Sequence, residues 1–185
     1  MHNDATGSKN SGGIAINYGN NNVAAKNNVS YNKLSGISVY RGDNNIIEEN
    51  VAQYNKQSFL YIHNGVGISI VEGSYNVIRK NDVAFNHLSG IRVSNTQHNH
   101  IEENKVYHNE KHGIEVKNNA HTNTLTRNSV HNNNVRGISI VGSNEMFLEK
   151  NSVCLNHDAD IVTESSTNNY GRRNRCKTGN WDDDG

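Results

Sequence analysis

The chain has 185 residues, within the usual size of one domain, and its 18 basic residues balance 18 acidic ones. This zero net charge argues against nucleic-acid binding, and no apolar run is long enough to span a membrane. Only 33% of the residues are hydrophobic, while 35 are asparagine, so the composition fits either disorder or a fold with a thin core and many turns.

Two interleaved motifs that recur about every 23 residues decide in favour of a fold. The first is a Gly-Ile pair, which begins at Gly13, Gly36, Gly67, Gly90, Gly113 and Gly137, with Asp160-Ile161 in the seventh place. The second is N-x-apolar-x-x-N-x-[V/A]-x-x-N, as in Asn99, Ile101, Asn104, Val106 and Asn109. Each apolar stretch is short and alternates with period two, which is typical of strands rather than helices.

One such repeat cannot bury its own apolar face, but stacked repeats can. We therefore predict an all-β fold: a right-handed, single-stranded parallel β-helix solenoid of about six to seven coils of about 23 residues, with three short strands per coil. Residues 1–185 form a single domain, with regular coils over 13–164 and a C-terminal coil or cap over 165–185. We expect the chain to be part of a longer solenoid.

Stacking in register makes equivalent residues of successive coils neighbours, which gives three expectations. Asparagine is expected at corners with left-handed backbone geometry and in amide ladders along the axis. Charges alternate in sign between coils, as at Glu48 over Arg79 and Arg92 over Glu115, and this favours a scaffold role for them. Tyr31, Tyr54 and Phe85 share one position and are expected to stack, either as a stiffening ladder or as a platform for a sugar ring.

The motif N-x-I-x-x-N-x-V-x-x-N-x-x-x-G-I-x-V resembles the parallel β-helix repeat of NosD-like and carbohydrate-processing β-helix proteins, over about Gly13 to Cys176. The resemblance implies the fold and an exported, periplasmic or surface location. It does not assign one activity, because the group includes pectate-lyase-like enzymes, alginate lyases and epimerases, surface proteins and copper-associated NosD proteins. The D-P-H signature of alginate epimerases is missing here, so no catalytic residue is carried over.

An insertion of eight residues between Asn55 and Gly67 interrupts the period and is the place where a site is expected. Tyr61 and His63 within it, with Arg92 on the next coil, are the candidate catalytic residues, because a Tyr/His pair can act as acid and base on a uronic acid whose carboxylate a cation neutralises. The alternative is that the insertion packs on the coil surface without chemistry. The candidate substrate-binding residues are Tyr40, Arg41 and Glu72.

The histidines and cysteines leave alternatives open. His98, His100 and His108 invite a surface metal site, although scattered solvated histidines are the simpler interpretation, and we predict neither a bound metal nor another cofactor. Cys154 and Cys176 are about one coil apart. That spacing suits a disulfide, but aligning the repeats places Cys176 on the inward row above Val153 and Cys154 one residue off it.

The function favoured by these observations is engagement of a polysaccharide along one long face. If the domain is an enzyme, it is a polysaccharide lyase or epimerase. The alternatives are a non-catalytic spacer or adhesin stalk and a NosD-like metal-handling module. An end-to-end or homo-oligomeric contact is expected at the N-terminal coil, which shows no capping helix.

Overall fold

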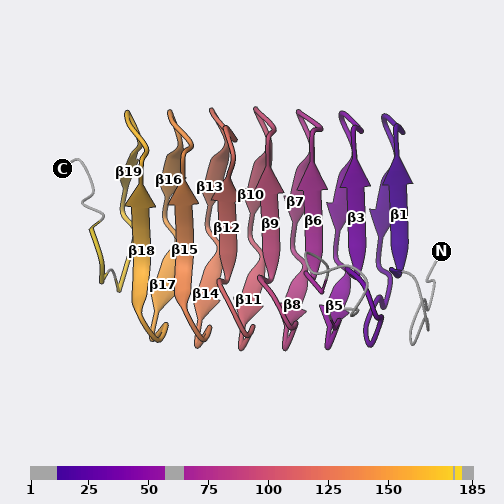
Figure 1. The fold of residues 1–185 in the computed structure, drawn as a ribbon, viewed down its shortest axis with the longest axis horizontal. Helices are drawn as coiled ribbons and strands as arrows, with labels where there is room; N and C mark the ends of the chain where they lie inside the picture. The colour runs from indigo at the N-terminus through magenta and orange to yellow at the C-terminus, as the bar shows by residue number, and fades with distance from the viewer. Residues whose placement is uncertain (1–11, 57–64, 177, 181–185) are drawn as a thin grey trace.

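The computed structural model describes residues 12–56, 65–176 and 178–180. They form a right-handed parallel β-solenoid in which successive coils lie side by side along one axis, with three strands in a complete coil (Figure 1). This confirms the predicted fold class. In the described residues there is no helix that is long and apolar enough to cross a membrane.

Three parallel sheets form the faces of the solenoid. Sheet B, at the front of Figure 1, consists of β1 (Ile14–Asn17), β3 (Ile37–Tyr40), β6 (Ile68–Val71), β9 (Ile91–Ser94), β12 (Ile114–Lys117), β15 (Arg136–Val141) and β18 (Ala159–Glu164). Sheet C consists of β2 (Val23–Ala25), β4 (Ile46–Glu48), β7 (Val77–Arg79), β10 (His100–Glu102), β13 (Thr124–Thr126), β16 (Phe147–Glu149) and β19 (Tyr170–Arg172). Sheet A consists of β5 (Val51–Gln53), β8 (Asp82–Ala84), β11 (Lys105–Tyr107), β14 (Ser129–His131) and β17 (Ser152–Cys154).

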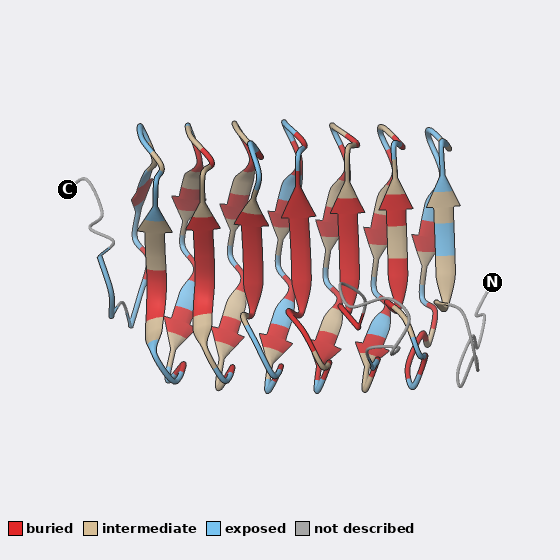
Figure 2. Cartoon of the chain, viewed as in Figure 1, coloured by how far each residue is buried: buried red, intermediate tan, exposed pale blue. Residues whose placement is uncertain are grey.

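The core is a set of aliphatic columns inside the three sheets. In sheet B the isoleucines of the Gly-Ile pairs stack directly on one another, as Ile91 does between Ile68 and Ile114. The side chains of Ile68, Ile91 and Ile114 are fully buried, as are Ile101 from sheet C and Val106 from sheet A. Figure 2 shows buried residues in the strands of all three sheets. Small and medium β-branched side chains suit this narrow space, which explains the low hydrophobic content of the sequence.

Three asparagine ladders join the coils at their corners, and Asn104 shows the repeating pattern. Its Oδ1 accepts hydrogen bonds from the backbone N (3.0 Å) and Nδ2 (2.9 Å) of Asn81 in the preceding coil. Its own backbone N and Nδ2 then donate to Oδ1 of Asn128 in the following coil, at 3.1 and 3.0 Å. Nδ2 also donates to the carbonyl of Ile78 at 2.8 Å. Each ladder therefore has a direction, with acceptors facing the N-terminal end of the solenoid.

The expected amide ladders are present, and asparagines such as Asn21 and Asn44 do have left-handed backbone, but they are not the asparagines of the ladders. The residue immediately before a ladder asparagine has positive φ, as at Glu103 (56°), His98 (56°) and His108 (52°), whereas the ladder asparagines themselves do not. The asparagine side chain must point inward to reach its neighbours, so the preceding residue makes the turn. Left-handed geometry is costly for residues other than glycine and asparagine, and the ladder bonds on both sides hold it in place.

The glycine of each Gly-Ile pair is required by space rather than by its φ angle. A Cβ added at Gly113 would lie 2.3 Å from Cγ1 of Val130 and 2.7 Å from the carbonyl oxygen of Gly137. Both contacts are much shorter than van der Waals distances. The glycine thus lets the chain pass close to the next coil before sheet B begins.

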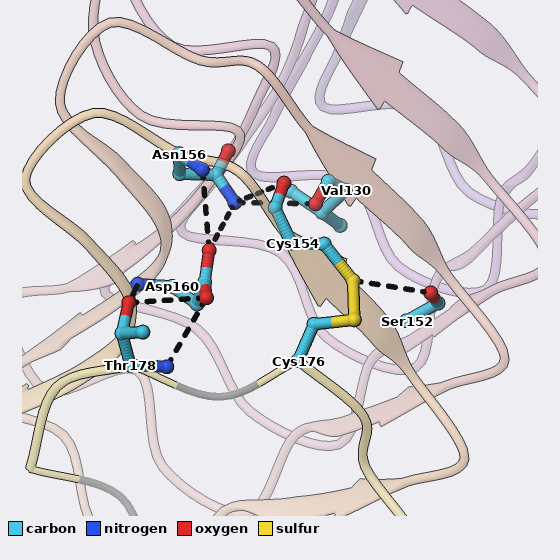
Figure 3. The surroundings of a disulfide bond; sticks show 7 residues. All are labelled: Val130, Ser152, Cys154, Asn156, Asp160, Cys176 and Thr178. Carbon is cyan, nitrogen blue, oxygen red and sulfur yellow. Dashed lines mark hydrogen bonds between the residues drawn. A yellow bond between two sulfur atoms is a disulfide. The ribbon is translucent and has the colours of Figure 1, made fainter.

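The last ladder ends at an aspartate, and a disulfide lies beside it (Figure 3). Oδ1 of Asp160 accepts from the backbone N and Nδ2 of Asn156, while its Oδ2 accepts from the backbone N and Oγ1 of Thr178. Cys154 and Cys176 form a disulfide with their Cα atoms 4.8 Å apart. The repeat alignment predicted that Cys176 would lie on the inward row above Val153. In the structure Cys176 is exposed and has a φ of 55°, so it does not continue that row.

The ladder direction predicts the effect of removing one central amide. Asn104→Ala leaves the backbone N and Nδ2 of Asn81 without their acceptor in a buried environment, so we expect a loss of unfolding free energy of roughly 2–4 kcal/mol. Chemical denaturation measures this loss. The control Asn134→Ala changes an exposed asparagine and should cost less than about 0.5 kcal/mol. Equal effects of the two substitutions would contradict a stabilising role for the ladder.

Candidate functional site

The outer face of sheet B carries charged residues in only part of its length. Position x of G-I-x-V is Ala15, Ser38 and Ser69 in the first coils, becomes Arg92 and Glu115, and returns to Ser139. The residue before the glycine changes in the same region, from serine at Ser89 to His112 and Arg136. We call Ser89, Arg92, His112, Glu115, Lys117 and Arg136 the charged cluster.

Three donors surround the carboxylate of Glu115, which is 8% exposed. Oε2 accepts from Nε of Arg92 at 2.7 Å and from Oγ of Ser89 at 2.8 Å, while Oε1 accepts from Nζ of Lys117 at 2.9 Å. Burial alone would raise the pKa of Glu115, but the charges and hydrogen bonds of Arg92 and Lys117 outweigh it and lower the pKa to about 2. Glu115 is therefore an ionised carboxylate that holds two cations in place.

Outward-facing residues are buried along the middle of sheet B. Figure 2 shows β6, β9, β12 and β15 buried along most of their length, whereas β1 and β3 alternate between more and less buried residues. Arg92 itself is only 8% exposed. The structure thus places this candidate catalytic cation beneath the surface, with its Nε bonded to Glu115. Its part in catalysis stays a prediction.

His112 and Arg136 lie where the chain enters β12 and β15. Burial lowers the pKa of His112, so its imidazole is neutral at pH 7, and its Nδ1 is buried with no hydrogen-bond partner among the described residues. Arg136 donates from Nη1 to Oγ of Ser139 at 3.3 Å and pairs with Glu164 through Nη2. The charged cluster thus contains a neutral base, His112, and two cations that remain partly exposed, Arg136 and Lys117.

Tyr40, Arg41 and Glu72 do come together, as a second group on the same sheet. Nε of Arg41 lies 2.6 Å from Oε2 of Glu72, and its guanidinium lies over the rings of Tyr40 and Tyr18, at 5.1 and 5.9 Å from their centroids. Tyr18, which the sequence analysis did not single out, packs edge-on against Tyr40 at 5.6 Å and is 65% exposed. We call Tyr18, Tyr40, Arg41 and Glu72 the tyrosine–arginine group.

Tyr61 and His63 lie outside the described residues. The structure therefore neither adds to nor removes from their proposed role as acid and base.

The aromatic stack is confirmed and longer than expected, but its geometry favours a stiffening role. Tyr31, Tyr54 and Phe85 stack with centroids 4.9 and 4.8 Å apart, and His108 continues the stack at 5.3 Å. The rings of Tyr54 and Phe85 cover each other's faces, so solvent meets their edges. A sugar ring binds an aromatic face, and the stacked faces of Tyr54 and Phe85 are not available for it.

The described histidines are not arranged as a metal site. The ring centroids of His98 and Tyr75 are 5.0 Å apart in a stacked pair. The ring centroids of His108 and His131 are 6.5 Å apart, within an aromatic group that includes Tyr107. Among the described residues, no three His, Cys, Asp or Glu side chains come close enough together to hold a metal ion.

The sequence contained a signal for His112 and Arg136 that motif searching missed. Both occupy the position before the glycine, which is otherwise glycine, serine, valine or alanine. A change from small residues to ionisable ones in two consecutive repeats is the signal that identifies them. The sequence pattern alone assigns Glu115 a role in setting the register.

The buried ion pair predicts a specific dependence on mutation and pH. Glu115→Gln leaves Arg92 buried without its counter-charge, so we expect a loss of unfolding free energy on the order of 3 kcal/mol. Because folding lowers the pKa of Glu115 from 4.5 to about 2, its contribution is complete above about pH 4.5 and disappears as the pH falls towards 2. Urea unfolding at pH 7 and pH 3 tests this: the difference between native and variant must shrink at pH 3. A constant difference would refute the ionised pair.

Comparison with known proteins places the fold in a family. The family model described as right handed beta helix region matches residues 2–66 and 66–182. Comparison with curated protein sequences gives no match.

Several solved structures are similar to the chain. The periplasmic alginate epimerase AlgG T265N mutant is 25% identical with a TM-score of 0.72, over 86% of this chain and 35% of that one. The Dettilon tailspike protein (gp208) is 19% identical with a TM-score of 0.76, over 92% and 38%. The Azotobacter vinelandii mannuronan C-5 epimerase AlgE6 A-module is 12% identical with a TM-score of 0.65, over 84% and 44%.

The chain spans less than half the length of each of these proteins, and at such low identity the likeness concerns the fold. The family match is broader, since it covers nearly the whole sequence. Together with three parallel sheets and stacked asparagine ladders, it shows that this chain belongs to the right-handed β-helix family.

Proposed function

We propose that the chain binds an acidic polysaccharide along the outer face of sheet B. The observation that carries the proposal is the charged cluster, a buried Arg–Glu pair with partly exposed cations. Other coils carry alanine or serine where Arg92 and Glu115 stand. A solenoid does not need this arrangement to fold, because other coils present serine at the same positions. The similarity to a periplasmic alginate epimerase supports the choice of ligand class.

Sheet B provides rows of residues that run along the axis. Tyr40 lies in one row with Val71, Ser94 and Lys117, because the strands pair in register. Successive coils are about 4.8 Å apart, which is comparable with the length of one sugar unit. An extended polysaccharide can therefore contact the tyrosine–arginine group and the charged cluster at once. The tyrosine rings offer apolar contact to sugar rings, and Lys117 and Arg136 attract carboxylates.

The site also has the groups for removing the proton next to a uronic acid carboxylate. The neutral imidazole of His112 is suited to accept that proton, and the nearby guanidinium of Arg136 stabilises the charge that develops on the carboxylate. Return of a proton to the opposite face of the carbon gives epimerisation, and expulsion of the glycosidic oxygen gives elimination. Tyr61 and His63 remain proposed partners for either outcome, together with Arg92.

A non-catalytic spacer or stalk is the principal alternative. The ladders, the aromatic stack and the core would serve a spacer equally well, but the charged cluster would have no purpose in one. An exported, periplasmic or surface location accompanies the proposal. It is supported by the Cys154–Cys176 disulfide, since such bonds persist in oxidising compartments, and by the periplasmic location printed for the similar epimerase.

Hydrogen exchange on the polymer tests the proposed chemistry. The protein is incubated with polymannuronate and polygalacturonate in deuterium oxide, and NMR measures deuterium at C5 while ultraviolet absorbance measures unsaturated products. We expect His112→Gln to reduce exchange by roughly 10²–10⁴-fold, because the general base is lost. Tyr61→Phe and His63→Ala are measured in parallel. If exchange persists in His112→Gln but is lost in His63→Ala, the general base is His63 and not His112.

Binding is tested separately by calorimetry. Arg41→Gln should weaken binding about tenfold, because Arg41 joins both tyrosines to Glu72. Arg79→Gln is the matched control: Arg79 is also paired with a glutamate at 2.6 Å, Glu48, but lies on sheet C. Binding without exchange would make the chain a binding module. If no polysaccharide binds, the spacer is the better explanation.

A further inference from the structure

The alternation of charges between coils fails at the C-terminal end of the solenoid. The residue before the middle ladder asparagine reads Lys26, Glu49, Lys80, Glu103, Arg127, Lys150 and Arg173 along the axis. The first five alternate in sign and form ion pairs, such as Lys26 with Glu49 at 3.5 Å and Arg127 with Glu103 at 2.9 Å. The last three are all positive.

Few carboxylates balance these charges. Glu149 is shared between Lys150, at 3.4 Å, and Arg172, at 3.0 Å. In the part of the chain that the structure describes, the guanidinium groups of Arg173 and Arg175 have no ion-pair partner. Like charges stacked at coil spacing repel, which is a cost that the preceding coils avoid.

The unpaired cations line a pocket. An open cavity of about 500 Å³ lies between sheets C and A and is lined by Lys150, Asn151, Ser152, Arg173, Asn174 and Arg175. Arg173 and Arg175 flank the last asparagine of the middle ladder, and the backbone of Arg175 pairs with that of Ser152. The ladder therefore fixes the backbone positions from which the two arginine side chains project. A rigid backbone thus holds three cationic side chains and a serine around one space.

We propose that this pocket binds an oxyanion of an acidic polysaccharide, either a carboxylate or a sulfate ester. Arginine recognises such groups with paired hydrogen bonds, and the serine hydroxyl adds a further donor. The pocket is local, whereas nucleic acid binding requires a basic stripe that follows the phosphate backbone, and the balanced charge of the chain offers none. The choice of a polysaccharide rests on the function proposed above, but the anion site rests on the pocket alone.

The position of the pocket makes it a second site rather than an extension of the first. The corner between sheets C and A faces away from sheet B, across the core (Figure 1). A polysaccharide lying along sheet B cannot also enter this pocket without bending around the solenoid. We therefore expect two independent sites for a short acidic oligosaccharide.

Calorimetry with short oligogalacturonate and with sulfated dextran oligosaccharide tests the pocket. The double variant Arg173→Gln/Arg175→Gln should remove one of two binding sites, or weaken that site at least tenfold, for the carboxylated or the sulfated probe. Lys26→Gln/Arg79→Gln removes the same total charge elsewhere and should change affinity less than twofold. Arg41→Gln should weaken the other site and leave this one intact, which distinguishes failure of the pocket from failure of sheet B.

Several results would overturn the proposal. They are equal binding by the double variant and the native chain, equally tight binding of neutral dextran, and equally tight binding of a thymidine oligonucleotide. Asp182, Asp183 and Asp184 are the chain's own acidic run, outside the described residues. If replacing these three with asparagine increased binding more than tenfold, that run would be the occupant instead.

A charge reversal separates binding from folding. Arg173→Glu restores alternation with Lys150, and glutamate already occupies this position with positive φ at Glu49 and Glu103. We expect the melting temperature to rise by about 1–3 °C in the absence of ligand while binding to the pocket is lost. A variant that is less stable than the native chain would show that Arg173 serves the fold and would refute the proposal.

Discussion

The buried asparagine ladders are the constraint on which the rest of the molecule depends. An asparagine in the middle of a ladder, such as Asn104, accepts two hydrogen bonds at Oδ1 from the preceding coil. Its backbone N and Nδ2 donate two to the following coil. No coil can therefore slip by one residue without leaving buried polar groups unpaired. The aliphatic core alone would not fix this register, because its columns repeat the same side chains. The ladders therefore determine which outer residues become neighbours.

A fixed register turns the outer surface into columns that can change without disturbing the fold. Two columns follow a simple rule over most of their length. Position x of the G-I-x-V motif on sheet B holds small residues, and the residue before each middle ladder asparagine alternates in charge. The Arg92–Glu115 pair departs from the first rule and requires the burial of two charges, which is rarely favourable by itself. The Lys150–Arg173 neighbours depart from the second. Neither departure is needed to stack the coils, because other coils lack it, and this is why both indicate binding rather than architecture.

The sequence was sufficient to predict the fold because the repeat records the stacking directly. The three strands per coil, the amide ladders, the aromatic stack and the pairing of Glu48 with Arg79 all follow from aligning the repeats. Local backbone geometry was less accessible: most of the left-handed residues come just before a ladder asparagine, and Cys176 leaves the inward row. These details depend on where each side chain points, which a period does not state.

The candidate site was only partly predictable for a different reason. Tyr40, Arg41 and Glu72 come together as the alignment implies, but the choice of Tyr61 and His63 came from an insertion that breaks the repeat. The charged cluster keeps the repeat and changes only its residue types, so His112 and Arg136 were overlooked and Glu115 was attributed to the scaffold. In a solenoid, a site built on the strands inherits rigidity from the ladders. Catalytic groups need such positional precision, and the strand-borne cluster has it, which favours this cluster as the place where a bound sugar would be held.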